Sequence, residues 1–160
     1  RLRWRMALQQ QGPWGDALHN ALKVVVSSIA QALQSDHIGR WVLSYGHMDA
    51  HSEWALTSVD SHGVIKDIVI DRSFVDRETG QRWVIDYKNS RPARDESLHD
   101  FLARETANYL PQLRLYCDTL RQLGQEPLRC ALFFTSLGRL HRVPELDLPA
   151  AANWTKPCDE

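Results

Sequence analysis

The stretch GVIKDIVIDRSFVDRETGQRWVIDYKNSR, residues 63–91, contains the strongest structural signal in the sequence. Residues 64–75 and 82–88 are rich in β-branched and aromatic side chains, and the polar segment DRETG, residues 76–80, separates them. Two such segments around a polar turn that ends in glycine are typical of a β-hairpin. The sequence therefore predicts an antiparallel pair of strands here.

The register of this hairpin decides which charged side chains meet. If the turn pairs Asp76 with Gln81, Asp71 lies directly opposite Asp86, and cross-strand partners have Cβ atoms about 4.5–5.5 Å apart. Lys88 shares the face of Asp86, because side chains alternate along a strand. Opposed like charges are destabilising, but a divalent cation reverses this, and two carboxylates suit Mg²⁺, which keeps waters and takes phosphate oxygens as further ligands.

The same hairpin also fits a simpler interpretation, in which one face is buried and the other is solvated. The expected apolar face carries Ile68, Ile70, Phe74, Trp83, Ile85 and Tyr87. The expected polar face carries Asp67, Val69, Asp71, Ser73, Val84, Asp86 and Lys88. Spacing alone leaves both interpretations open.

The segments outside the hairpin predict helices before and after it. A helix is expected from about Asp16, with an apolar stripe formed by Leu18, Leu22, Val25, Ile29 and Leu33. A long helix is expected over residues 98–123, with Pro111 causing a kink and Gly124 as its C-terminal cap.

Further strands are predicted at residues 41–43, 53–57 and 128–134, the last apolar enough to be buried on both faces. The order of elements predicts an α/β fold, with a mixed sheet flanked by helices. Residues 1–14 are a basic lead-in, and residues 144–160 have no assignment.

Composition fits one compact domain of 160 residues, with 43% hydrophobic and 24% charged residues. The formal net charge of -1 argues against a module that binds nucleic acid by charge alone. No apolar run approaches the roughly 20 residues that span a bilayer, so no membrane partner is expected. The three cysteines are far apart, which disfavours disulfides, zinc and iron–sulfur clusters and suggests a cytoplasmic location.

The quoted stretch, together with HSEWALT (residues 51–57) and YLPQLRLY (residues 109–116), resembles the nuclease domain of the RecB and AddA subunits of bacterial recombination helicase–nucleases. These proteins belong to the wider D…(D/E)-x-K nuclease superfamily. The resemblance covers roughly residues 15–143 and implies a restriction-endonuclease-like sheet.

The resemblance also implies a set of site residues. Asp71 and Asp86 match the metal-binding carboxylates, the main-chain carbonyl of Tyr87 is a further ligand, and Lys88 matches the catalytic lysine. His19, in GDALHNAL, resembles the histidine that this family places on its first helix as another metal ligand. A lone helix histidine can equally be structural or exposed.

Other positions match the family pattern beside the metal. Glu53 matches the acidic residue of the first core strand, and Gln112 and Tyr116 match a Q-x-x-x-Y helix beside the site. These three could instead be a strand-edge charge and core positions. Arg91 is a candidate phosphate contact, with a solvated loop as the alternative.

The function implied is a Mg²⁺-dependent deoxyribonuclease, whose metal site Mn²⁺ or Ca²⁺ could also occupy, acting in double-strand-break processing and recombinational repair. The expected substrate is single-stranded DNA. No G-x-x-x-x-G-K-[ST] loop is present, so the chain is expected to be a nuclease domain excised from a longer helicase–nuclease. The expected partners are that helicase domain and a second nuclease or helicase subunit.

Two alternatives remain open at this point. One is a non-catalytic scaffold that keeps the nuclease fold. The other is a dimeric enzyme of the same superfamily, such as a junction resolvase or a restriction-type endonuclease.

Overall fold

The computed structural model describes residues 15–34, 37–59 and 63–156. Its elements follow in the order α2 (Asp16–Gln34), α3 (Ile38–Leu43), β1 (Met48–Val59), β2 (Ile65–Val75), β3 (Arg82–Lys88), α4 (Leu98–Leu123), β4 (Leu128–Phe134), β5 (Arg139–Arg142) and the 3-10 helix η1 (Pro144–Leu146). None of the described helices is long and apolar enough to cross a bilayer.

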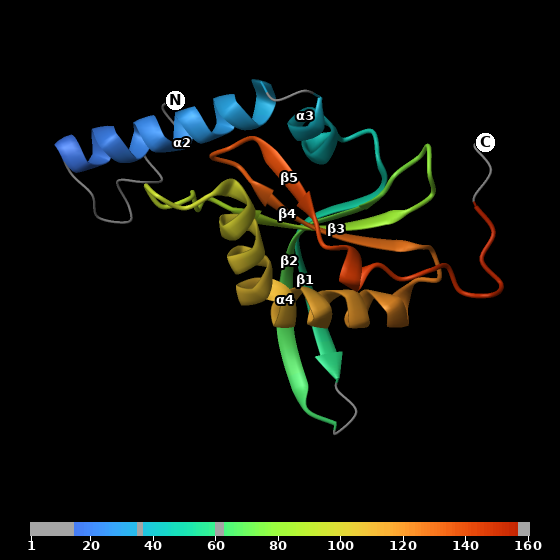
Figure 1. The fold of residues 1–160 in the computed structure, drawn as a ribbon. Helices are drawn as coiled ribbons and strands as arrows, with labels where there is room; N and C mark the ends of the chain where they lie inside the picture. The colour runs from blue at the N-terminus through green and yellow to red at the C-terminus, as the bar shows by residue number, and fades with distance from the viewer. Residues whose placement is uncertain (1–14, 35–36, 60–62, 157–160) are drawn as a thin grey trace.

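The strands form one sheet in the order β1-β2-β3-β4-β5. β1, β2 and β3 are antiparallel neighbours, β3 and β4 are parallel, and β4 and β5 are antiparallel. α4 makes the crossover that a parallel pair requires. Figure 1 shows α2 and α3 on one side of the sheet and α4 on the other. The predicted mixed α/β sheet with flanking helices is confirmed.

The β2–β3 hairpin has the predicted register. The turn closes with the Asp76 amide donating to the Gln81 carbonyl at 2.9 Å, and Arg72 pairs with Ile85. Gly80 has a φ of 67°, a left-handed conformation that glycine adopts at little cost. No residue is inserted in the turn, so the alternation of faces runs unbroken from Arg82 to Lys88.

Two hydrophobic clusters cover the two faces of the central strands. On the α4 side, Val84 and Leu132 pack with Phe101, Leu113 and other helix residues. On the opposite side lie Phe74, Ile85, Ala131 and Phe133 with Ala32 of α2 and Val42 of α3. β3 and β4 are therefore buried on both faces, as predicted for residues 128–134.

The predicted face of two β2 residues is wrong. Ile68 and Ile70 pack with Val84 on the α4 side, not with Phe74 on the other side. The alternation is interrupted next to Asp71, and Glu53, which lies opposite this point on β1, has a φ of 51°. A positive φ in a non-glycine residue marks a local distortion of the strand.

The predicted strand at residues 41–43 is also wrong, because this segment lies in α3. A short apolar run fits a buried helix as well as a strand. Contact with α2 decides between them. Gly39 approaches α2 so closely that a Cβ there would lie 1.5 Å from the Ala32 carbonyl oxygen, and Val42 is fully buried.

The predicted helix at Asp16 exists, but its buried stripe differs from the expected one. Leu18, Ser28 and Ala32 are buried, whereas Ile29 and Leu33 are 39% and 40% exposed. α2 packs chiefly against α3, where Gly39 lies against Ala32, so small residues occupy part of its buried face.

The predicted long helix has the bounds of α4, and Gly124 follows it as the C-cap. α4 remains one helix but changes direction along its length, as expected with Pro111 inside it (Figure 1). β5 was not predicted, because Arg139–Arg142 has no apolar pattern and exists through its pairing with β4.

Replacing Asp76 with Ala should destabilise the fold. The Asp76 carboxylate accepts hydrogen bonds from Trp41 Nε1 (2.9 Å), from the Thr79 amide (2.8 Å) and from Thr79 Oγ1 (2.9 Å). Hydrogen bonds to charged groups contribute about 1.5–3 kcal/mol, so a loss of roughly 2 kcal/mol in unfolding free energy is expected from urea denaturation. Glu78→Ala, at an exposed position of the same turn, should change it by less than about 0.5 kcal/mol.

Candidate active site

Two carboxylates lie side by side where β2 and β3 meet. The Asp71 carboxylate accepts a hydrogen bond from the Tyr87 amide at 2.7 Å, which holds it against β3 next to Asp86. Asp86 points to the α4 side of the sheet and is only 2% exposed. The hairpin therefore gathers the two acids that its register predicted.

Asp86 has two side-chain partners. Its Oδ2 atom forms an ion pair with Lys88 Nζ at 2.6 Å, and its Oδ1 atom accepts a hydrogen bond from Gln112 Nε2 at 3.3 Å. Oδ2 is buried and, among the described residues, accepts no regular hydrogen bond besides this ion pair. Burying a charged oxygen with so few partners is energetically costly. A second cation bound to this oxygen would lower that cost.

The electrostatics of Asp86 follow from this burial. Removal from water, the largest influence, raises the pKa of Asp86 above the ordinary aspartate value, and the negative charge of Asp71 raises it further. The Lys88 ammonium opposes the shift. The balance still favours the neutral form more than in water, so a further cation would stabilise the charged carboxylate.

Lys88 is held in place from several directions. Its Nζ lies 3.7 Å from the centre of the Tyr109 ring, a cation–π contact, besides its ion pair with Asp86. Its carbonyl accepts the Thr135 amide at 2.9 Å. The lysine side chain is only 16% exposed, so the ammonium is kept at the site rather than in bulk water.

One face of α4 supplies the remaining polar groups. Glu105, Tyr109, Gln112 and Tyr116 recur at helical spacing, and the last three surround Asp86 and Lys88. Gln112 Nε2 also donates to the Tyr116 hydroxyl, which links the helix to the carboxylate. Burial is the main cause of a raised Tyr116 pKa, with Asp86 and Asp71 adding to it.

The two carboxylates fit a hard divalent cation. Magnesium prefers oxygen ligands and is usually held by one or two carboxylates, with waters and substrate phosphates completing its shell. The described residues contain no group of three or more His, Cys, Asp or Glu side chains that could hold a metal ion. Asp71 and Asp86 instead match a magnesium site in which the protein supplies two carboxylates. The buried Oδ2 atom of Asp86 and the two negative charges both favour a bound cation.

The structure does not bring every predicted residue to these carboxylates. His19 is exposed on α2 beside Gly15, Leu18 and Leu22, and no described contact joins it to Asp71 or Asp86. Its role as a metal ligand stays a prediction.

Glu53 and Tyr87 lie close to the carboxylates without a described side-chain bond to them. Glu53 is exposed on β1 opposite Asp71, at the distorted point of the strand. The Tyr87 ring packs on the opposite face against Phe133, and burial raises the pKa of Tyr87 to about 12. Only its backbone belongs to the Asp71 side.

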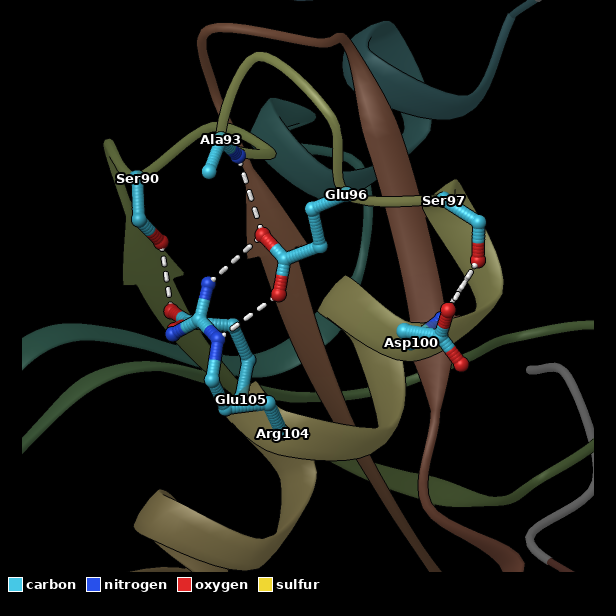
Figure 2. A network of polar contacts seen from close by, with 7 residues as sticks. All are labelled: Ser90, Ala93, Glu96, Ser97, Asp100, Arg104 and Glu105. Carbon is cyan, nitrogen blue, oxygen red and sulfur yellow. Dashed lines mark hydrogen bonds and ion pairs between the residues drawn. The ribbon is translucent and has the colours of Figure 1, made fainter.

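The loop after Lys88 is pinned to the start of α4, as Figure 2 shows. Ser90 Oγ donates to Glu105 at 2.5 Å, and Glu105 is only 4% exposed. The Ala93 amide donates to Glu96 at 2.9 Å, and Arg104 bridges Glu96 and Glu105. This clamp gives the loop that carries Arg91 a defined path.

Sequence analysis missed most of these supporting residues. Ser90, Glu96 and Arg104 fall in a polar stretch that has no motif of its own. The helical spacing in the sequence does place Tyr109 and Glu105 on the face of Gln112. Their contacts with the strand end required knowledge of how α4 docks.

Comparison with known protein families identifies the superfamily of the chain. The family model described as the PD-(D/E)XK nuclease superfamily matches residues 43–156, which include all the strands of the sheet and α4. No curated protein matches the chain. The matched range contains Asp71, Asp86 and Lys88 in the arrangement described above. The chain belongs to the PD-(D/E)XK nuclease superfamily.

Proposed function

We propose that this protein is a metal-dependent deoxyribonuclease of the RecB and AddA type. The observation that carries the proposal is the meeting of Asp71, Asp86 and Lys88 where β2 and β3 adjoin, with a buried Asp86 oxygen that, among the described residues, is paired with Lys88 alone. A stable fold has no need of two adjacent acids beneath a helix. Membership in a nuclease superfamily supports phosphodiester hydrolysis as the reaction at these residues.

In this proposal, Asp71, Asp86 and the Tyr87 carbonyl hold Mg²⁺, which Mn²⁺ or Ca²⁺ could replace. When bound, the cation supplies Lewis-acid activation of the phosphate and of the attacking water. The cation then balances the negative charges of Asp71 and Asp86, of which Lys88 pairs with Asp86. His19 and Glu53 remain proposed contributors from α2 and β1.

Lys88 acts on the reacting groups. Its ammonium donates hydrogen bonds, so it can orient the water and stabilise the negative charge that grows on the phosphate oxygens. Water adds its oxygen to phosphorus and loses a proton, while the bond to the leaving nucleotide oxygen breaks and that oxygen gains a proton. Tyr109 and the Thr135 amide hold the lysine in position for this role.

Gln112 and Tyr116 support the assignment to the RecB and AddA type. They match the Q-x-x-x-Y pattern, and Gln112 joins the Tyr116 hydroxyl to the Asp86 carboxylate. We propose that the substrate is single-stranded DNA delivered by the helicase domain of a longer chain, with a second nuclease or helicase subunit. The reaction would then belong to double-strand-break processing and recombinational repair.

The central test uses activity and metal binding together. The chain should degrade single-stranded DNA in Mg²⁺ and not in EDTA, and Lys88→Ala should reduce the rate by about a hundredfold or more. In thermal unfolding, Mg²⁺ at a hundred times its Kd should stabilise the wild type by about 2.7 kcal/mol. Lys88→Ala should keep this stabilisation, and Asp86→Asn should lose it.

These results also separate the alternatives. Equal cleavage by wild type and Lys88→Ala would mean that the activity comes from a contaminant. A wild type that binds no Mg²⁺ or Mn²⁺ at millimolar concentration would be a scaffold. A stable dimer in sedimentation that cuts only duplex DNA would favour a resolvase or restriction-type enzyme.

Gln112→Ala provides a test of the helix contribution. Groups that orient a metal ligand typically contribute 10–100-fold to metal affinity or activity, so a loss of this size is expected. Gln112 is exposed, so the melting temperature without metal should change little. Gln122→Ala, which removes the same side chain from an exposed position of the last turn of α4, should leave activity unchanged. An equal effect of both changes would contradict the positioning role.

A further inference from the structure

A second polar site lies on the other side of the end of β3. A pocket of about 330 Å³ between α2 and the loop after β3 is lined by Lys23, Val24, Ser27, Asn89 and Arg91. It combines one cation from a helix with another from a loop more than sixty positions later in the chain. The fold, and not the sequence, brings these two charges to one hollow.

The charges of Lys23 and Arg91 have no partner among the described residues. None of the described residues that line it is acidic. Neither Lys23 nor Arg91 forms an ion pair or hydrogen bond with any other described residue. The two cations of the pocket repel each other. An anion bound between them would attract both and offset this repulsion. The chemistry therefore favours an anionic ligand.

Asn89 adds a fixed hydrogen-bond donor. Its Oδ1 atom accepts from Ser28 Oγ at 3.1 Å and from Thr135 Oγ1 at 3.4 Å. These two donors leave the amide NH₂ group of Asn89 available to the pocket. An ammonium, a guanidinium and an amide donor together are the groups that proteins use to bind phosphate oxygens.

The pocket and the candidate active site are joined through the end of β3. Asn89 directly follows Lys88, and Thr135 Oγ1 contacts both the Lys88 carbonyl (3.3 Å) and the Asn89 side chain. Side chains alternate, so Lys88 faces α4 while Asn89 reaches α2. A DNA strand with its scissile phosphate at Lys88 would have to pass around the end of β3 to place a neighbouring phosphate at Asn89 and the pocket.

The loop that carries Arg91 is also pre-organised. Ser90, on one side of Arg91, is bonded to buried Glu105, and Ala93, on the other side, is bonded to Glu96 (Figure 2). An anchored loop loses less entropy when a ligand binds. The hydrogen bonds of Ser90 and Ala93 would therefore favour ligand binding at Arg91 as well as stabilise the fold.

We propose that Lys23, Asn89 and Arg91 form a subsite for a backbone phosphate of the DNA strand, next to the phosphate that is cut. α2 then belongs to the substrate-binding surface through Lys23. This inference rests on the proposed nuclease function, and it adds residues for which the family match offers no role.

The test measures the salt dependence of DNA binding. Single-stranded DNA binding is followed by fluorescence anisotropy in Mg²⁺, with the full chain carrying Lys88→Ala so that the DNA stays intact. Adding Lys23→Ala or Arg91→Ala should weaken binding several-fold at low salt and lower the slope of log K against log salt by about 0.7 each. Lys23→Arg keeps the positive charge, so both the affinity and the salt slope should stay at the values measured without a change at Lys23. Arg40→Ala removes an exposed cation from α3, outside the pocket, and should leave the slope unchanged.

Cleavage assays separate this inference from the nuclease proposal. With Lys88 intact, Lys23→Ala and Arg91→Ala should raise KM several-fold and largely preserve kcat. If both variants bind and cut as the wild type does, the phosphate subsite is wrong and the nuclease proposal stands. An equal loss in Arg40→Ala, or an effect seen only with DNA that has a 5′-terminal phosphate, would overturn a backbone subsite. If the wild type neither binds nor cuts DNA, both proposals fail.

Discussion

The structure depends on a carboxylate that is removed from water with incomplete compensation. Asp86 lies on the central strand β3, beneath α4, and meets Lys88 and Gln112 with Asp71 beside it. Burial raises the free energy of the charged Asp86 carboxylate, and a cation bound beside it would lower that free energy. A strand covered on both faces provides this environment, because it excludes water and fixes the side chains in position.

The end of β3 serves two surfaces at once. Successive residues point to opposite sides, so Lys88 joins the carboxylates under α4 and Asn89 joins the basic pocket beside α2. The Thr135 hydroxyl, directly after β4, lies within hydrogen-bond distance of the Lys88 carbonyl and of the Asn89 side chain. The parallel pairing of β3 and β4 thus places the candidate active site on one side of the sheet and the basic pocket on the other.

Local patterns predicted some elements well and others poorly. The hairpin, α4 and β4 have dense signals, namely a polar turn, a capped long helix and an apolar run, and their register and bounds are confirmed. The segment at residues 41–43 was predicted wrongly, because the contact of Gly39 with α2 decides its conformation. The faces of Ile68 and Ile70 were also wrong, since no pattern signals the distortion opposite Asp71.

The sequence by itself determined the turn and register that bring Asp71 beside β3, and the alternation that puts Asp86 and Lys88 on one face, because strand geometry is local and has a period of two. It also placed Gln112 and Tyr116 one helical turn apart. Only the tertiary structure decided that α4 covers Asp86, that the Glu105 clamp fixes the loop after β3, and that Lys23 meets Arg91. These contacts join residues far apart in the chain, and they depend on how helices pack on the sheet, which no local pattern encodes.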